Sequence, residues 1–395
     1  MDYETPDYSP PPPPPPPRPP GRARQRIQQR RDTAEHRVVA EPKRARAMPQ
    51  LAPAGKVKLP EIRLPSSQRL ILYGAGAVLF VAVVVFILGR IRNQTAETPP
   101  NAVFIGENWT YNSHDSADVI ELAEALRARS IGTVYAWFSW LEADNTWNNT
   151  DRFAQVDQFA AQLKAAYPEV ELLAWIVVPV NAGQGYRLDQ PDLQTQVAQF
   201  SQLAIGEYGF DGVFINADPL SIDDQNFLAL LRRVRLSIGD TAVLAAAIPP
   251  DWRPGDTNVP ASAEIAPATE WSTEYKQSVA LLLDEIVIMA FNSRITSAAD
   301  YSQWMAHQVS SYAQAIAGLG EDIQTRVLIG IPTHDADGQG HDPQVENISS
   351  AANGIRVGTA AAGDAASYVQ GVAIYAEWTA DDAEWAQFSS LWLGR

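Results

Sequence analysis

From residue 101 to the C-terminus, short runs of apolar, β-type residues alternate with longer amphipathic stretches. Most of the short runs are continuously hydrophobic, which is the pattern of parallel strands covered on both faces. Eight strand–helix pairs follow one another in this way. The predicted strands are Ala102–Ile105, Thr133–Phe138, Val170–Val178, Gly212–Asn216, Ala242–Ala247, Glu285–Ala290, Val327–Ile331 and Gly371–Tyr375.

The stretches between the strands have apolar residues at three- and four-residue spacing, which predicts helices. They include Ala117–Arg129, Phe153–Ala166, Asp224–Ile238, Ala299–Leu319 and Ala380–Leu393. Eight such units in about 290 residues match the usual size of a (β/α)8 barrel, the TIM-barrel fold. A doubly wound open sheet is the alternative, but no Gly-rich phosphate loop follows any strand. The sequence therefore predicts an α/β protein in which residues 102–395 form a (β/α)8 barrel.

Upstream of the barrel, Leu70–Gly89 is a run of 20 residues without a charge. A helix of this length spans roughly 30 Å of hydrocarbon, and the run begins too late in the chain for a cleavable signal peptide. We expect one membrane-spanning helix within residues 69–92, followed by a linker over residues 93–101. The basic residues before it predict a cytoplasmic N-terminus, so the barrel would lie outside the cell membrane.

Residues 1–68 have the composition of a disordered tail that is basic and rich in proline. The unbroken run Pro10–Pro17 favours a polyproline II rod. The rod could bind a proline-recognition module and the basic cluster could contact anionic lipid, although a solvated tether is the alternative. Nothing folded accompanies the positive charge, so we expect no nucleic-acid partner.

The charge changes sign at the predicted membrane span. Up to Arg92 there are 16 Lys and Arg against 7 Asp and Glu, and beyond it 14 against 39, so the barrel is strongly acidic. The chain has no cysteine, which excludes disulfides, thiolate catalysis and cysteine-based metal sites. The five histidines have no metal-ligand spacing, and we expect no cofactor.

Active sites of (β/α)8 barrels lie at the C-terminal ends of the strands, and here these ends are rich in aromatic and acidic residues. Indole rings suit sugars, because C–H faces pack on the aromatic plane while carboxylates and amides bind the hydroxyls. The predicted substrate-binding residues are Glu107, Trp109, Trp137, Trp175, His341, Glu377 and Trp378. For His341, hydrogen bonding within its loop is the alternative. We expect a further group of tryptophans to pack against the barrel wall: Trp271, Trp304, Trp385 and Trp392.

The segment Gly209–Pro219 resembles the fourth-strand motif of the chitinase-like family 18 glycoside hydrolases. Met289–Asn292, Gly330–Thr333 and Gly371–Tyr375 are similar to elements of the sixth, seventh and eighth strands of that family. The resemblance implies a (β/α)8 barrel. It also implies a fourth strand with alternating carboxylates that end in a glutamate acid, and catalysis assisted by the acetamido group of the substrate.

The chain departs from the family at the catalytic positions. Phe214 and Asn216 stand where the family has aspartates, and Asp218 stands where it has the acid glutamate. Asn292 replaces the aspartate of the sixth-strand element, and Asp211 alone is retained. The predicted catalytic set is Asp218, Asn216, Asn292 and Asp211. An aspartate retracts the carboxyl by one methylene, and a misplacement of about 1 Å can cost on the order of 100-fold in rate.

Three functions fit these residues. The first is a membrane-anchored barrel that binds a cell-surface or cell-wall polysaccharide with little or no hydrolysis, as a pseudoenzyme would. The second is an active glycosidase in which Asp218 is the general acid and Glu107 or Glu377 supplies the second carboxylate. The third is a structural or protein-interaction barrel. For Asp218, capping of the next helix or pairing with an arginine is the alternative to catalysis.

Overall fold

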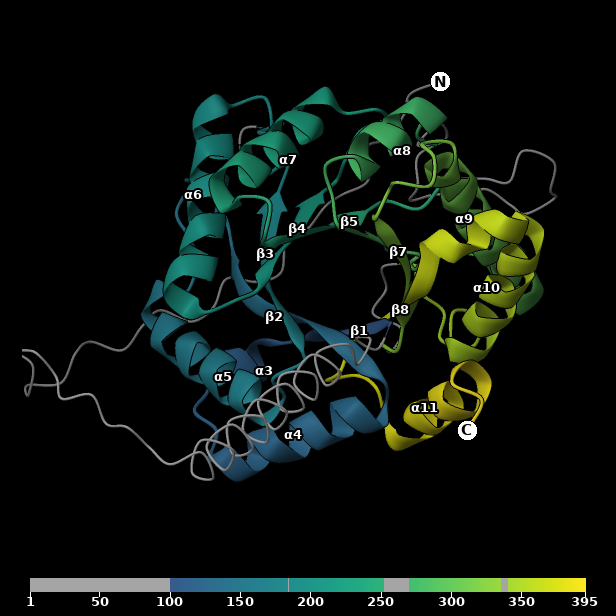
Figure 1. Cartoon of the computed structure of the whole chain (residues 1–395), viewed down its shortest axis with the longest axis horizontal. Helices are drawn as coiled ribbons and strands as arrows, with labels where there is room; N and C mark the ends of the chain where they lie inside the picture. The colour runs from purple at the N-terminus through teal and green to yellow at the C-terminus, as the bar shows by residue number, and fades with distance from the viewer. Residues whose placement is uncertain (1–99, 184, 252–269, 335–339) are drawn as a thin grey trace, which may run out of the picture. The chain divides into compact units, whose positions relative to one another are not determined.

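The computed structural model describes residues 100–395 except 184, 252–269 and 335–339. Eight parallel strands form a closed barrel, with the helices around it (Figure 1). The strands are β1 (Asn101–Ile105), β2 (Ile131–Trp140), β3 (Glu171–Pro179), β4 (Gly212–Asp218), β5 (Val243–Ile248), β6 (Glu285–Ile288), β7 (Arg326–Pro332) and β8 (Val369–Tyr375). The larger helices are α4 (Ser116–Ala128), α5 (Phe153–Ala166), α6 (Pro191–Tyr208), α7 (Gln225–Ile238), α8 (Thr273–Ala280), α9 (Ala298–Ala317) and α10 (Ile348–Ala362).

The strands follow one another around the ring in chain order, and β1 pairs with both β2 and β8. In the first strand, Ala102 is paired with Thr133 of β2 on one side and with Ala373 of β8 on the other. The predicted (β/α)8 barrel is therefore confirmed. Its first strand begins at Asn101, which is the last residue of the predicted linker.

The C-terminal segment differs from the single helix predicted over Ala380–Leu393. It consists of α11 (Asp382–Gln387) and a turn of wider π-helix over Phe388–Trp392. A capping box at Asp381 and Glu384 starts α11. Side-chain caps also begin other helices, among them Asp115 at α4 and Asp224 at α7, because the first backbone N–H groups of a helix have no partner within it.

Alternate residues of each strand face either the helices or the barrel axis. In β4, Val213, Ile215 and Ala217 pack in the layer between strands and helices, whereas Phe214 packs in the interior. The interior is filled by rings from the first four strands. Phe104 lies 4.7 Å from Tyr135 and 5.2 Å from Phe214, measured between ring centroids. None of these three side chains has any solvent-exposed surface, so this part of the barrel is a packed core.

A charged network closes the N-terminal end of the barrel. Arg326, the first residue of β7, lies 2.6 Å from the buried Glu285 carboxylate and also pairs with Glu171. The hydroxyl of Tyr135 donates to Glu285 as well. Burial raises the pKa of Glu285 to about 8, and the hydrogen bond from Tyr135 works against that rise. The network links strands β2, β3, β6 and β7 at the end of the barrel away from the mouth.

The described residues contain no helix that is long and apolar enough to cross a membrane. The predicted span Leu70–Gly89, the tail 1–68 and the linker up to residue 99 lie outside the described residues.

Helices α9 and α10 pack closely because small residues of α10 meet the backbone of α9. A Cβ atom added at Gly358 would lie 2.6 Å from the carbonyl oxygen of Ala306 and 2.6 Å from Cβ of Val309. A real Cβ atom does not approach backbone this closely, so any larger residue would force the two helices apart.

Gly358→Ala should therefore lower the free energy of unfolding by about 1–3 kcal/mol. The matched control is Gly206→Ala in α6, where an added Cβ meets nothing within 4 Å. That change should raise the free energy of unfolding by about 0.5–1 kcal/mol, because alanine favours helix more than glycine does. Urea unfolding followed by circular dichroism measures both. Equal effects of the two substitutions would contradict the close packing of α9 on α10.

Candidate functional site at the barrel mouth

Asp218 is the last residue of β4 and stands at the rim of the mouth. By the alternation of the strand, Asn216 and Asp218 point to the same side as Phe214, toward the barrel axis. Solvent reaches Asp218 at the open mouth, but protein surrounds its carboxyl on the other sides, and this desolvation raises its pKa. Asp218 is therefore an acid at the rim of the mouth that keeps its proton up to a higher pH than a free aspartate does.

Aromatic rings of β2, β3 and the end of β8 contact one another on the mouth side of the barrel. Trp175 of β3 is 4% exposed and meets Trp137 edge to face, with 4.8 Å between the ring centroids. Trp378, which follows β8, is 48% exposed and lies nearly parallel to Trp175 at 6.4 Å. Tyr375 lies 5.9 Å from Trp378. The structure therefore brings three of the predicted sugar-binding tryptophans together.

The buried Trp175 also has a polar atom, the indole nitrogen. The indole Nε1 of Trp175 is buried and has no hydrogen-bond partner among the described residues. A buried donor of this kind favours a ligand oxygen or an ordered water molecule. Trp378 packs against the end of β1, where a Cβ at Gly106 would lie 2.9 Å from its Cε3 atom.

Glu377, Trp109 and Glu107 form a separate group on the β1 side of the mouth. Burial raises the pKa of Glu377, and a hydrogen bond from Trp109 and the charge of Arg129 partly offset that rise. The ring of Trp109 packs on His114 at 4.4 Å. Glu107 begins the short helix α3 (Glu107–Thr110) and lines a polar cavity of about 330 Å³. The other residues of the cavity are Asn108, Tyr111, Asn112, Asn149 and Arg152.

The structure gives no sign of an acid pair between Asp218 and this group. In the closed strand order, β4 is four strands away from β8, so Asp218 and Glu377 start from opposite sides of the ring. Burial is the cause of the raised pKa of Asp218, and no charged group in the described part of the chain contributes to it. The second carboxylate of a two-acid glycosidase stays a prediction for Glu107 and Glu377.

Asn292 and His341 belong to a loop cluster around a buried carboxylate that the sequence did not indicate. Glu346 accepts hydrogen bonds from the backbone N–H groups of Asn292 and Ser293, at 2.8 and 2.7 Å. His341 Nδ1 lies 2.9 Å from the same carboxylate. The ring of His341 is buried and packs on His334 at 4.0 Å between centroids. His341 thus has the loop hydrogen-bonding role that was the alternative to substrate binding.

Asp211 lies at the other end of β4 from the mouth. Its carboxylate pairs with Lys164 at 2.8 Å and accepts from the backbone N–H of Leu172 at 2.8 Å. Asp218 lies seven positions further along the extended chain, roughly 23 Å at about 3.3 Å per residue. The structure gives Asp211 a role in holding β3 to β4 and does not place it with the other residues of the predicted catalytic set.

The four tryptophans predicted to pack against the barrel wall do so. Trp271 and Trp304 are at most 2% exposed and Trp385 is 7% exposed, although Trp271 precedes α8 and does not lie within it. Trp392 is partly buried against the same core. In the segments after β5 and before α8, together with α9, Asp251, Glu270 and His307 bring three potential metal ligands together, and no motif in the sequence indicated them.

Comparison with known proteins gives similarity in fold only. No protein-family model and no curated protein match the chain. Among solved structures, a chitinase from Bacteroides thetaiotaomicron is 13% identical, with a TM-score of 0.49 over 74% of this chain and 94% of that chain. The Ostrinia furnacalis Group IV chitinase is 13% identical, with a TM-score of 0.47 over 74% of this chain and 98% of that chain. The Bacillus cereus spore cortex-lytic enzyme SleL is 10% identical, with a TM-score of 0.46 over 74% of both chains.

The raised pKa of Asp218 predicts a pH-dependent effect on stability. The folded protein binds the Asp218 proton more tightly than the unfolded chain does, so this group lowers the free energy of unfolding as the pH rises from the ordinary aspartate pKa through the folded one. Asp218→Asn removes the charge and keeps the shape. It should raise the melting temperature at pH 7 and leave it nearly unchanged at pH 3, where the native carboxyl is already neutral. Equal effects at both pH values, measured by calorimetry, would contradict the raised pKa.

Proposed function

We propose that the barrel binds a cell-surface or cell-wall glycan at its mouth, with little or no hydrolysis of the chitinase type. The observation that carries this proposal is the half-exposed indole of Trp378, which lies nearly parallel to the buried Trp175 on the β8 side of the mouth. An exposed ring of this kind is a stacking surface for the C–H face of a sugar. Asn216 and Asp218 on β4 supply polar atoms for the sugar hydroxyls.

The side chains on the inner face of β4 support binding without turnover. Phe214 occupies the interior position that precedes Asn216 and Asp218 on the same face of β4, and it is fully buried against Phe104 and Tyr135. A carboxylate there would have to be buried among aromatic rings, at a high cost in desolvation. Asp218 is then the sole acid on this face of the strand.

An active glycosidase with Asp218 as the general acid is the second candidate. The raised pKa of Asp218 favours it, because a general acid must hold its proton near the working pH. The missing part is a partner that stabilises the developing positive charge of the sugar ring. In the chitinase-like family the acetamido group of the substrate assists in that step, so only substrates with such a group fit this candidate.

Incubation of the purified full-length chain with chitin-type and peptidoglycan-type oligomers separates these functions. Binding is measured by calorimetry and products by mass spectrometry. We expect binding without products. Trp378→Ala should weaken binding by about 1.5 kcal/mol, roughly tenfold, through loss of the stacking surface. Leu236→Ala is the control, because Leu236 is an exposed apolar side chain on α7 and lies outside the mouth.

The other outcomes identify the competing functions. Products that disappear in Asp218→Asn would establish the glycosidase and overturn the proposal. Absence of affinity for any of the oligomers would leave a structural or protein-interaction barrel. Equal losses of binding in Trp378→Ala and Leu236→Ala would show that the indole is not the contact surface.

We further propose that the protein is held in the cell membrane by Leu70–Gly89, with residues 1–68 in the cytoplasm and the barrel outside. The uncharged length of this segment and the excess of basic residues before it support this orientation. In this arrangement the tail is free to contact anionic lipid or a proline-binding module.

Deletion of residues 70–89 should move the chain from the membrane fraction to the soluble fraction. Deletion of residues 10–17, the proline run, is the control and should leave the chain in the membrane fraction. Protease added to intact cells should cut the barrel side only. Retention of the 70–89 deletion in the membrane, under conditions that strip peripheral proteins, would refute the anchor.

A further inference from the structure

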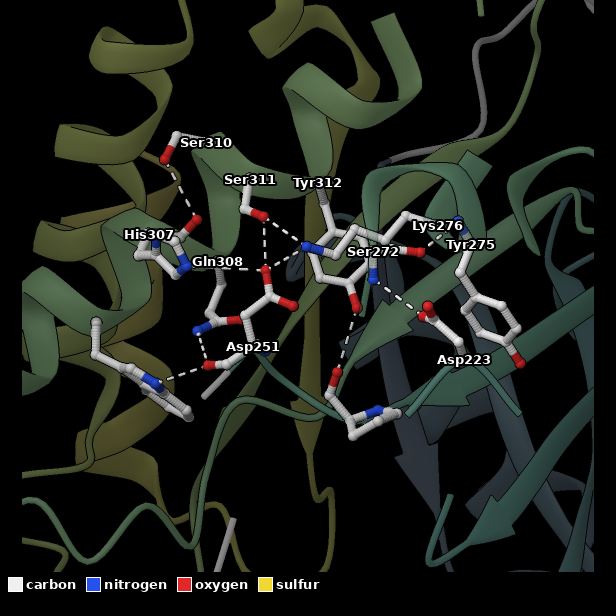
Figure 2. A network of polar contacts seen from close by, with 12 residues as sticks. Asp223, Asp251, Ser272, Tyr275, Lys276, His307, Gln308, Ser310, Ser311 and Tyr312 are labelled. Atoms are coloured by element: carbon white, nitrogen blue, oxygen red, sulfur yellow. Dashed lines mark hydrogen bonds and ion pairs between the residues drawn. The ribbon is translucent and has the colours of Figure 1, made fainter. Parts of the chain in front are cut away.

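The segment that follows β5 is fixed between helices α8 and α9 by its last described residue, Asp251 (Figure 2). The backbone N–H of Asp251 donates to Gln308 Oε1 at 2.6 Å, and its carbonyl accepts from Gln308 Nε2 at 2.7 Å. Trp304 Nε1 donates to the same carbonyl at 3.0 Å. Asp251 is 1% exposed. Its side chain is therefore held in one place within the helix layer of the barrel.

The carboxylate of Asp251 has one oxygen in use and one without a partner. Oδ2 accepts from Lys276 Nζ at 2.5 Å and from Ser311 Oγ at 2.6 Å (Figure 2). Oδ1 is buried and accepts no hydrogen bond from the described residues. A buried carboxylate oxygen without a donor or cation is costly, so this half of the group favours a further positive charge.

Two more potential ligands face this carboxylate. One atom from each of Asp251, Glu270 and His307 lies within 4.8 Å of the others. His307 Nε2 is 3.8 Å from Asp251 Oδ2, and it is buried without a hydrogen-bond partner in the described part of the chain. Burial lowers the pKa of His307, which favours the neutral ring with a free lone pair. The three residues come from the two sides of the β5–α8 connection and from α9.

We propose that Asp251, Glu270 and His307 bind a divalent cation of the Zn²⁺ class. The cation joins the β5–α8 connection to helix α9, and solvent completes its coordination on the side of the exposed Glu270. Three protein ligands with an open fourth position are a common zinc arrangement. Bonds of about 2.0–2.2 Å in a tetrahedron place the ligand atoms about 3.3–3.6 Å apart. His307 Nε2 is 3.8 Å from Oδ2 of Asp251, the oxygen that also accepts from Lys276 and Ser311, so these two ligand atoms must approach by a few tenths of an ångström.

The charges of the cluster suit one divalent ion. Two carboxylates and the Lys276 ammonium leave one net negative charge beside a neutral imidazole, and Lys276 also lies 4.7 Å from the ring of Tyr312. Lys276 donates to one oxygen of Asp251 and contacts Ser311, and its charge also lowers the pKa of His307. The imidazole ligand selects Zn²⁺ and related transition ions over Mg²⁺ and Ca²⁺, which prefer oxygen ligands alone.

Metal titration of the full-length chain tests this site directly. After treatment with a chelator, calorimetry with ZnCl₂ should give one ion per chain, and MgCl₂ should give no binding. Glu270→Gln and His307→Gln should each weaken Zn²⁺ binding by at least roughly tenfold. Co²⁺ placed in the site should have the visible absorption of a four-coordinate ion, and His307→Gln should remove it. His114→Gln is the control, because His114 contacts Asn108 near the mouth and should leave the titration unchanged.

The competing results are distinct. Absence of Zn²⁺ binding to the native chain overturns the proposal. Binding that survives unchanged in both Gln variants means adventitious surface binding and also overturns it. Circular dichroism of the two variants should match the native spectrum, because Gln is close in size to both residues and Glu270 is exposed. Should one variant misfold, the Co²⁺ spectrum of the native chain and the other variant still decide the matter. The glycan experiments are independent of this result.

Discussion

The filling of the barrel interior is the constraint on which the rest of the structure depends. An eight-stranded ring is just wide enough to be filled by its own side chains. Here large rings from β1 to β4 take up that space, and the network around Arg326 and Glu285 closes the N-terminal end. At the mouth, such packing leaves room for polar side chains that face the axis only within about the last three residues of a strand such as β4. Asn216 and Asp218 are at that level, whereas Phe214 is below it.

The fold could be predicted because burial on two faces leaves a strong pattern in the sequence. All eight predicted strands correspond to observed strands, and Phe153–Ala166 has the bounds of α5. The first and last residues of the strands were less well predicted. For example, β8 begins two residues before the predicted Gly371. The predicted last helix was divided because Phe388–Trp392 adopts a wider turn, and the spacing of apolar residues does not distinguish the two forms.

The candidate site was predicted in part. The gathering of Trp137, Trp175 and Trp378 followed from their positions on the consecutive strands β2 and β3 and just after the closing strand β8. The contact between Glu377 and Trp109 could not be predicted from the sequence. The alternation of inward and outward side chains holds only within a strand, and both residues lie beyond the end of one. Glu346 and Asp251 could not be found at all. Each acts through residues that lie about 50 positions away in the chain, and no local motif records such a contact.

The contact between Gly106 and Trp378 joins the first strand to the segment after the last one. The indole can lie against the end of β1 because residue 106 has no side chain, and a methyl group there would meet its Cε3 atom at 2.9 Å. The ring would then have to move away from residue 106. The position of the exposed indole at the mouth is therefore set by a residue without a side chain in a distant part of the sequence, and a single substitution there changes the shape of the opening.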